Sequence, residues 1–229
     1  MIETTHLSTQ FDEDLERLRS RVLEMGGLVE SQLNMTTMAY ADNNSTIVLD
    51  VLENDHDVNE LEKIIDDDLI HVIAKRQPTA SDLRLVMAIS KMVTDLERSG
   101  DEVKKMAKSI RRIQERDVTV LKATTDVRHL ADAASKQIRS ALDTFARLDV
   151  SEASSIIDAD EALDTEFKAI VRQLITYMME DPRSITTAMD IITIARAIER
   201  VGDHAKNIAE QVIYIVEGRD VRHMNSNDS

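Results

Sequence analysis

The sequence predicts an all-α protein built from two tandem, homologous three-helix bundles. Two observations predict this fold class, namely the composition and an internal repeat. The 229 residues include only five Gly and two Pro, and a chain with so few turn-forming residues favours long helices over strands joined by turns. Apolar residues make up 42% of the chain, which is enough to form a buried core.

The internal repeat appears when the chain is compared with itself. A shift of 105 positions brings Val22 onto Val127 and Ile65 onto Ile170, with apolar residues meeting apolar residues between them. Each unit contains one proline, Pro78 or Pro182. After these prolines, a shift of 102 aligns residues 96–101 (Leu-Glu-Arg-Ser-Gly-Asp) with residues 198–203 (Ile-Glu-Arg-Val-Gly-Asp). The chain therefore contains one structural unit twice.

Each unit contains three apolar stripes in which the residues are spaced alternately by four and three positions. This spacing is typical of helices that bury one face, with coiled-coil character. Long helices of this kind make elongated bundles, joined end to end or side by side. The stripes predict helices at residues 11–29, 51–72 and 89–110, and near 122–147, 151–180 and 184–217.

Helix breaks divide the chain at sensible places. Asn43-Asn44-Ser45 separates the first two helices, and Thr79-Ala80-Ser81-Asp82 after Pro78 resembles a capping box that opens the third. Ser184 can serve in the same way after Pro182. We expect a first unit at residues 1–112, a connecting segment at 113–122, a second unit at 123–218 and a frayed tail at 219–229.

Charge and cysteine content exclude several classes of function. The chain has 28 basic and 43 acidic residues and a net charge of −15, so it repels nucleic acids and anionic lipids, and we expect neither nucleic acid binding nor direct membrane insertion. The absence of cysteine excludes disulfides and thiolate metal sites. The N-terminal stretch is polar and acidic, so we expect a cytoplasmic protein.

Carboxylates occupy two positions of the apolar stripes. Asp55 and Asp160 stand where the pattern calls for an apolar residue, and an isolated buried carboxylate is costly unless it is paired or coordinated. Asp164 follows Asp160 by four residues and therefore lies on the same helix face. The corresponding neighbour of Asp55 is Asn59.

The third helix of each unit adds another acidic pair of the same spacing, Glu97 with Asp101 and Glu199 with Asp203. Like charges at this spacing repel, but a shared hard cation reverses the sign of the interaction. We therefore expect a weakly held divalent cation, with Mg²⁺, Mn²⁺, Fe²⁺ or Zn²⁺ as candidates. The expected ligands are Glu97, Asp101, Glu199, Asp203, Asp160, Asp164 and Asp55.

The alternative is that these acids belong to ordinary surface ion pairs. Asp101 has Lys105 four residues later, and Asp203 has Lys206 three residues later. Surface pairs of this kind contribute little to stability. The repetition of the acidic pattern in both units is what favours a site over this alternative.

Glycines and arginines flank the acidic pairs. Gly100 and Gly202 stand in mid-helix, where Gly costs about 1 kcal/mol relative to Ala, so we expect close helix contacts there. Arg98 and Arg200 adjoin the acids and are candidate partner-binding groups. Arg76 and Arg84, near the first hairpin, are expected to be exposed and are further candidates of this kind.

Catalytic motifs are absent from the sequence, so we expect no enzymatic activity. One Glu-x-x-His motif, Glu53 to His56, leaves a ferritin-like di-iron or storage protein as an alternative. Such a protein needs two motifs of this type in one four-helix core. A third possibility is a purely structural bundle whose acids are solvated.

Four segments resemble the PhoU family: residues 25–30, 74–84, 95–101 and 197–203. The resemblance extends from about Phe11 to Gly218, and the Glu-Arg-x-Gly-Asp segments carry most of its specificity. It implies a cytoplasmic negative regulator of the phosphate-starvation response and of phosphate uptake. Such regulators contact the ATPase subunit of the phosphate ABC transporter and the phosphate-sensing histidine kinase, and many of them are homodimers.

The resemblance also implies metal binding through Glu/Asp-x-x-x-Asp motifs. In this sequence the motif is intact at Glu97 with Asp101, at Glu199 with Asp203 and at Asp160 with Asp164. It is broken at Asp55, and the first helix of each unit lacks a clear acidic pair. A weakly held cation therefore agrees better with the sequence than a tight multinuclear cluster does.

Overall fold

A computed structural model describes residues 3–53, 55–116 and 124–221 of the chain. All the regular structure in these residues is helical, which confirms the predicted all-α class. The predicted connecting segment and frayed tail fall partly on residues 117–123 and 222–229, which lie outside the described residues. The helices are α1 (Glu3–Ala41), α2 (Ser45–Glu53), α3 (Asp55–Arg76), α4 (Ala80–Gln114), α5 (Thr124–Arg147), α6 (Val150–Glu180), the short 3₁₀ helix η1 (Pro182–Ser184) and α7 (Ile185–Glu217).

The ends of the helices differ in detail from the sequence prediction. The predicted break after α1 is confirmed, because Asn43 has a φ of 51° and the Asn44 side chain accepts a hydrogen bond from the Thr46 amide at 3.1 Å. The predicted second helix covers α2 and α3, which the structure describes on either side of residue 54. Thr79 and Ser184 are the N-cap residues of α4 and α7, as predicted, but neither side chain accepts a capping hydrogen bond.

The two capping hydroxyls donate hydrogen bonds instead of accepting them from helix amides. Thr79 donates to the Asp82 carboxylate at 2.6 Å, and Ser184 donates to the Asp181 carbonyl oxygen at 2.7 Å. In front of α7, the Asp181 carboxylate accepts a hydrogen bond from the Arg183 amide at 3.0 Å. A carboxylate therefore takes the hydroxyl of Thr79, and a backbone carbonyl takes that of Ser184.

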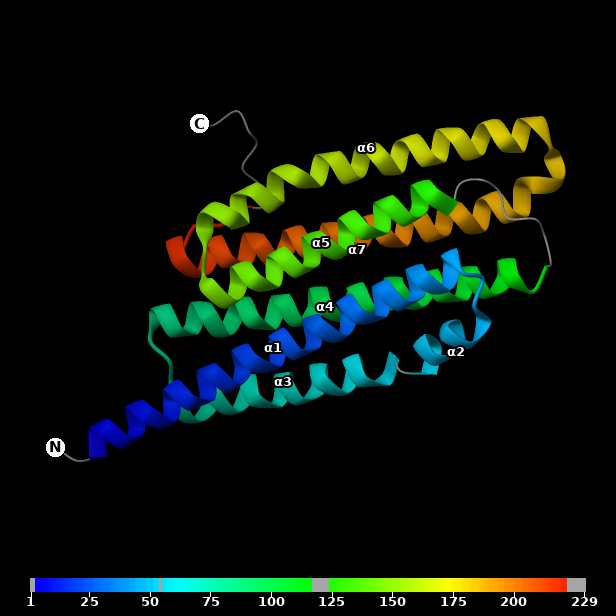
Figure 1. Ribbon diagram of the computed structural model, residues 1–229. Coiled ribbons are helices and arrows are strands. Elements are labelled where there is room, and N and C mark those ends of the chain that lie inside the picture. Colours follow the sequence, from blue (N-terminus) through cyan, green and yellow to red (C-terminus); the bar gives the residue numbers. More distant parts are fainter. Residues whose placement is uncertain (1–2, 54, 117–123, 222–229) are drawn as a thin grey trace.

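The two units lie side by side (Figure 1). α1, α4, α5 and α7 form a central group of four helices, with α4 and α7 behind α1 and α5 in this view. α3 packs on the outside of α1 and α4, and α6 packs in the same way on α5 and α7. The α3–α4 and α6–α7 hairpins end at opposite ends of the molecule, because the two units run in opposite directions (Figure 1).

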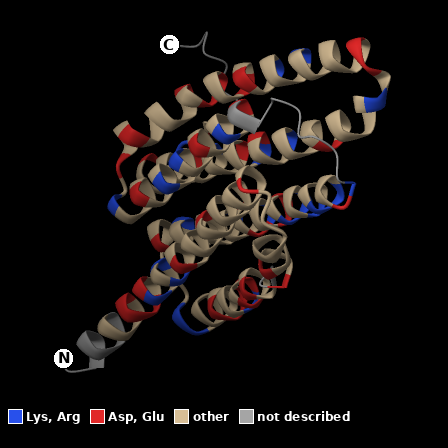
Figure 2. Cartoon of the chain, turned by 45° about the vertical axis from the view of Figure 1, so that its right-hand side comes forward, with Lys and Arg blue, Asp and Glu red and all other residues tan. Residues whose placement is uncertain are grey.

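The predicted stripes form the core. Val22 of α1 and its equivalent Val127 of α5 are fully buried, as is Ile65 of α3. α1 and α5 meet closely at Gly26, where a Cβ atom would lie 2.4 Å from a methyl carbon of Leu142. Figure 2 shows Asp and Glu along the long helices, with Lys and Arg between them.

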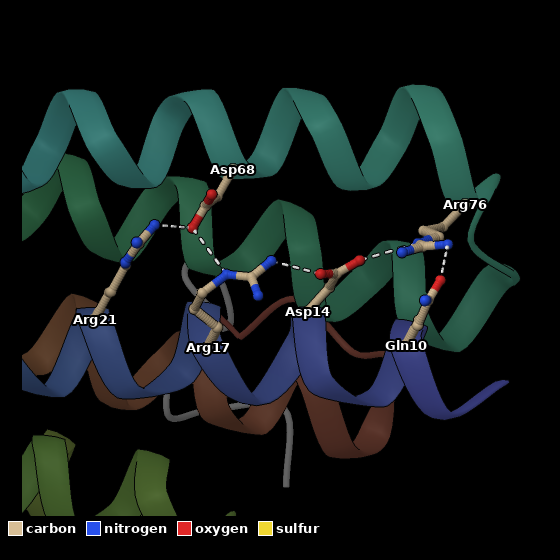
Figure 3. Close-up of polar contacts among 6 residues, drawn as sticks. All are labelled: Gln10, Asp14, Arg17, Arg21, Asp68 and Arg76. Atoms are coloured by element: carbon tan, nitrogen blue, oxygen red, sulfur yellow. Dashed lines mark hydrogen bonds and ion pairs between the residues drawn. The ribbon is translucent and has the colours of Figure 1, made fainter. Parts of the chain in front are cut away.

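Partly buried ion pairs connect the helices at several points. Asp190 at the beginning of α7 accepts hydrogen bonds from Arg112 and Arg116 near the end of α4, at 2.8 and 2.5 Å. Asp14 of α1 lies between Arg17 and Arg76, and Asp68 of α3 contacts Arg17 as well as Arg21, so that α1 and α3 are joined by a ladder of charges (Figure 3).

Candidate functional site

The second unit brings two of the predicted acidic pairs together. Asp160 and Asp164 lie on α6 and face Glu199 and Asp203 on α7. Burial raises the pKa of the Asp203 carboxyl, and the negative charges of Asp160 and Asp164 raise it further. Burial likewise raises the pKa of Glu199, followed by repulsion from Asp203 and Asp164. The four carboxylates therefore form one electrostatic cluster, which favours a cation.

The hydrogen bonding of Glu199 and Asp160 determines which carboxylates of this cluster are available to a cation. Oε2 of Glu199 is buried and has no hydrogen-bond partner, which is costly for a carboxylate oxygen. Asp160 is already engaged, because Lys206 donates a hydrogen bond to its Oδ2 at 2.9 Å and Gln137 reaches its Oδ1 at 3.5 Å. Glu199 and Asp203 are thus more available than Asp160.

The first unit builds its cluster from different residues of α3. The pKa of Glu62 is raised by burial and then by the charges of Glu97, Asp66 and Asp101, so these four carboxylates lie near one another. Neither Glu62 nor Asp66 is among the ligands expected from the sequence. The signal was present, because the two residues form a Glu-x-x-x-Asp pair of their own. Asp55 is the first residue of α3, and its side chain lies outside the described part of the structure.

The mid-helix glycines behave differently in the two units. A Cβ atom at Gly202 would lie 3.1 Å from Leu163 and 3.2 Å from the Gln137 side chain, so the expected close approach of α6 and α7 is confirmed. At Gly100 the nearest atom is a Val58 methyl carbon at 3.4 Å, which is an ordinary contact. The expectation of a tight contact at Gly100 is therefore wrong.

The donor chemistry of both clusters suits a hard divalent cation, and the unpaired oxygen of Glu199 fits such an ion. Within residues 3–53, 55–116 and 124–221, no three carboxylate or imidazole side chains converge closely enough to hold an ion as they stand. A bound cation therefore requires small side-chain movements. The assignment of these acids as metal ligands stays a prediction.

A polar groove of about 740 Å³ runs between α4 and α7. Arg98 and Arg200 occupy equivalent positions in the repeat, and both line this groove. Arg200 donates to Glu102 at 2.9 Å, and Lys105 contacts the same carboxylate at 2.8 Å. The groove thus joins the two units through charged side chains, close to both acidic clusters.

Comparison with known proteins identifies the family. The family model described as the PhoU domain matches the chain twice, over residues 22–110 and 127–212. The chain belongs to the PhoU family. It is 46% identical over 221 residues to a phosphate-specific transport system accessory protein PhoU homolog of Pseudomonas putida, covering 96% of this chain and 86% of that protein. It is 41% identical over 224 residues to the accessory protein PhoU of Escherichia coli K12, covering 97% and 92%.

Solved PhoU structures have the same fold. The crystal structure of PhoU from Pseudomonas aeruginosa matches with a TM-score of 0.88 and 45% identity, covering 91% of this chain and all of that one. The phosphate transport system regulatory protein PhoU from Streptococcus pneumoniae matches with a TM-score of 0.84 and 26% identity, covering 92% and 99%. The names of these relatives describe accessory and regulatory proteins rather than enzymes.

The remaining arginines of this PhoU family member are less exposed than expected. Arg76 is only 18% exposed, because it donates to Asp14 at 2.9 Å (Figure 3). Arg84 is half-buried, with its guanidinium against Gly218 at the end of α7 and its Nε lacking a hydrogen-bond partner. Both expectations of exposure are wrong, because these arginines pack against neighbouring helices.

His56, the histidine of the Glu-x-x-His motif, lies 3.6 Å from Glu60 of its own helix and is 72% exposed. It therefore points into solvent rather than into a di-iron core. The helices of the described residues include none that is both long enough and apolar enough to cross a bilayer.

Proposed function

We propose that the protein is a non-enzymatic adaptor that represses the phosphate-starvation response and restrains phosphate uptake. Its partners are the ATPase subunit of the phosphate ABC transporter and the phosphate-sensing histidine kinase. It acts in the cytoplasm, at the inner face of the membrane through these partners, as a homodimer. The observation that carries this proposal is that the chain matches proteins named as phosphate transport accessory proteins along nearly its whole length.

The architecture supports an adaptor. Two homologous units joined side by side offer two distinct outer surfaces, one built from α3 and α4 and one from α6 and α7 (Figure 1). Arg98, Arg200 and Glu102 line the groove between α4 and α7, where the two units meet. A movement of one unit would therefore alter charged contacts with the other.

Deletion of the gene tests this proposal. We expect alkaline phosphatase activity to become high in phosphate-rich medium, and to be repressed again when the wild-type gene is supplied on a plasmid. Unchanged repression in the deletion strain would reject the regulatory role. Pull-down of the purified ATPase subunit and of the cytoplasmic part of the kinase tests the two partners separately.

We further propose that the adaptor binds a divalent cation at one or both acidic clusters. In the second unit Glu199, Asp203 and Asp164 would hold the ion, with Asp160 joining them if Lys206 moves away. In the first unit the ligands would be Glu97 and Asp101 with Glu62 and Asp66. A bound cation would neutralise repulsion between neighbouring helices and so stabilise each unit.

Calorimetric titration of Mn²⁺ and Mg²⁺ into chelator-stripped protein tests the metal proposal. The matched variant replaces Glu97, Asp101, Glu199 and Asp203 by Ala. We expect heat of binding in the wild type and its loss in the variant. If neither protein binds, the metal proposal fails while the adaptor proposal stands.

A further inference from the structure

The two hairpins of the molecule carry the same exposed apolar tip. In each unit the outer helix and the helix that follows it expose large apolar side chains next to the hairpin, with exposed fractions between 40% and 80%. Most of these positions correspond in the repeat, at shifts of 105 and 102. The residues are Ile70, Ile73, Leu83 and Met87 in the first unit, and Ile175, Met179, Ile185 and Met189 in the second.

In the second unit the apolar tip continues into a basic groove. Residues 168, 172, 175 and 179 on α6 and residues 185, 189, 192 and 196 on α7 are spaced by three or four positions, so each set follows one face of its helix. We name these eight residues the α6–α7 face. They include Lys168, Arg172 and Arg196, which line a groove of about 440 Å³ with Phe167, Val171 and Ile192.

The three cations of the α6–α7 face are exposed. The Arg196 guanidinium lies 4.4 Å from the centre of the Phe167 ring and 3.4 Å from Glu199. Lys168 lies 3.4 Å from Asp164 at the edge of the face, and Arg172 donates a hydrogen bond to the backbone oxygen of Lys168 at 3.3 Å. Apolar side chains and cations thus share one surface on a chain whose net charge is −15.

The first unit lacks the three basic residues that adjoin the apolar tip in the second unit. Its equivalent face, the α3–α4 face, has Lys63 in place of Lys168, but Asp67 in place of Arg172 and Thr94 in place of Arg196. Its groove is smaller, about 210 Å³, and has Asp66 on its lining. The two faces therefore share an apolar tip, but the α6–α7 face has three cations beside it, whereas the α3–α4 face has one lysine among aspartates.

We propose that the α6–α7 face is the docking surface for an amphipathic helix of a partner protein that carries carboxylates at one end of its apolar side. This inference rests on the proposed adaptor function and assigns one of its two partners to the second unit. A groove between two antiparallel helices accepts a third helix through apolar anchors three or four residues apart. Carboxylates at one end of that helix would reach Lys168, Arg172 and Arg196, and this charge complementarity would fix its orientation.

A second copy of this chain is the competing occupant, because its α3–α4 face combines Asp66 and Asp67 with an apolar tip. The homodimer proposed above can form through other surfaces, and Lys63 beside Asp67 makes the α3–α4 face a poorer complement to three cations than a helix end that carries carboxylates alone. Sedimentation of the wild type and of the charge-reversed variant described below distinguishes the two occupants.

The test measures binding of the ATPase subunit and of the cytoplasmic part of the kinase to the full-length protein. The charge-reversed variant is Lys168→Glu, Arg172→Glu, Arg196→Glu, and a tip variant is Ile175→Ser, Met179→Ser. The matched controls in the first unit are Lys63→Glu and Ile70→Ser. All these positions are exposed, so circular dichroism is expected to show unchanged folding.

Two synthetic helical peptides complete the test. Both carry leucines at positions i, i+3, i+4 and i+7, and they differ in having three glutamates or three lysines at one end. We expect both second-unit variants to bind one partner at least about tenfold more weakly and to retain the other within about twofold. The glutamate peptide, and not the lysine peptide, should bind the wild type and compete with the partner that is lost. The first-unit controls, Lys63→Glu and Ile70→Ser, should still bind the partner that the second-unit variants lose.

Retention of both partners by the charge-reversed variant, or equal loss of both, would overturn the inference while leaving the adaptor function in place. A wild-type dimer that the charge-reversed variant converts to monomer would identify the face as a self-interface and also overturn it. If neither partner binds the wild type, the adaptor proposal fails. In that case, tighter binding of the glutamate peptide than of the lysine peptide to the wild type would support the inference, and equal binding would overturn it.

Discussion

Lys206 of α7 donates a hydrogen bond to the Asp160 carboxylate of α6 at 2.9 Å. The sequence pattern assigned Asp160 to a metal site, yet here a lysine ammonium already balances its charge. Asp160 raises the pKa of Lys206, so the ammonium stays protonated at neutral pH. Lys206 therefore occupies the position that a divalent cation would need and competes with it.

Replacing Lys206 by Met should strengthen cation binding in the second unit. Removal of the ammonium frees Asp160 and leaves the cluster more negative, so we expect Mn²⁺ to bind roughly tenfold more tightly in calorimetry of the chelator-stripped protein. Lys105→Met is the control, because Lys105 pairs with Glu102 rather than with the cluster. Unchanged or weaker Mn²⁺ binding in Lys206→Met would show that Asp160 is not a ligand.

Glu62 in the first unit should destabilise the metal-free protein at neutral pH. Burial and the charges of Glu97, Asp66 and Asp101 raise its folded pKa above the ordinary value of 4.5. The folded state thus binds more protons than the unfolded state just above pH 4.5, and the stability falls as the pH rises through that window. We expect Glu62→Gln to raise the urea midpoint at pH 7 and to reduce this pH dependence.

The control for that experiment is Glu60→Gln. Glu60 lies on the same helix but pairs with Lys63 at 2.7 Å, and this hydrogen bond lowers its pKa. Its replacement should leave the urea midpoint unchanged or slightly lower. A lower midpoint in Glu62→Gln as well would mean that Glu62 makes a favourable contact, and the first cluster would then lose its electrostatic basis.

The fold was predictable because helical spacing directly reports which residues are buried. Ile65 and Ile170 correspond in the repeat, and both are buried in the structure. The helix bounds were less predictable, because α1 begins at Glu3 whereas the apolar stripe begins only at Phe11. Periodicity records the direction of side chains, and it does not record where a helix begins or ends.

The acidic clusters were only partly predictable, since an acidic pair shows that two carboxylates share a helix face but not which helix they meet. The repeat pointed to Asp55 because its equivalent is Asp160. The first unit brings Glu62 and Asp66 to Glu97, and these two residues lie about two and three turns after Asp55 along α3. Phe167 and Val171 occupy those positions in the second unit, so the repeat itself concealed them.

Gly100 and Gly202 should respond differently to substitution by alanine. Gly100→Ala gains about 1 kcal/mol of helix propensity and meets only an ordinary contact with Val58, so the free energy of unfolding should rise. Gly202→Ala would place its methyl group 3.1 Å from Leu163, so we expect that gain to be cancelled or reversed. Urea unfolding of both variants measures the difference, and equal gains would show that α6 moves away from α7 without cost.

Asp14 should contribute to stability through the ladder of charges between α1 and α3 (Figure 3). Burial acts to raise its pKa, but hydrogen bonds from Arg17 and Arg76 outweigh burial and bring the pKa below 3.8. The stability contributed by this carboxylate is therefore present above pH 3.8 and lost as the pH falls through the lower folded value.

Asp14→Asn should lower the free energy of unfolding at pH 7 by about 1–3 kcal/mol, because a charged hydrogen-bond acceptor is removed from two guanidinium groups. The same substitution should make less difference when unfolding is measured at pH 3, because this pH lies below the ordinary pKa of 3.8 and the contribution of the carboxylate falls as the pH drops below that value. Glu16→Gln is the control, since Glu16 is 70% exposed and pairs with Arg19 on the same helix. Equal effects of the two substitutions would mean that Arg17 and Arg76 find other acceptors, and that the ladder does not hold α3 against α1.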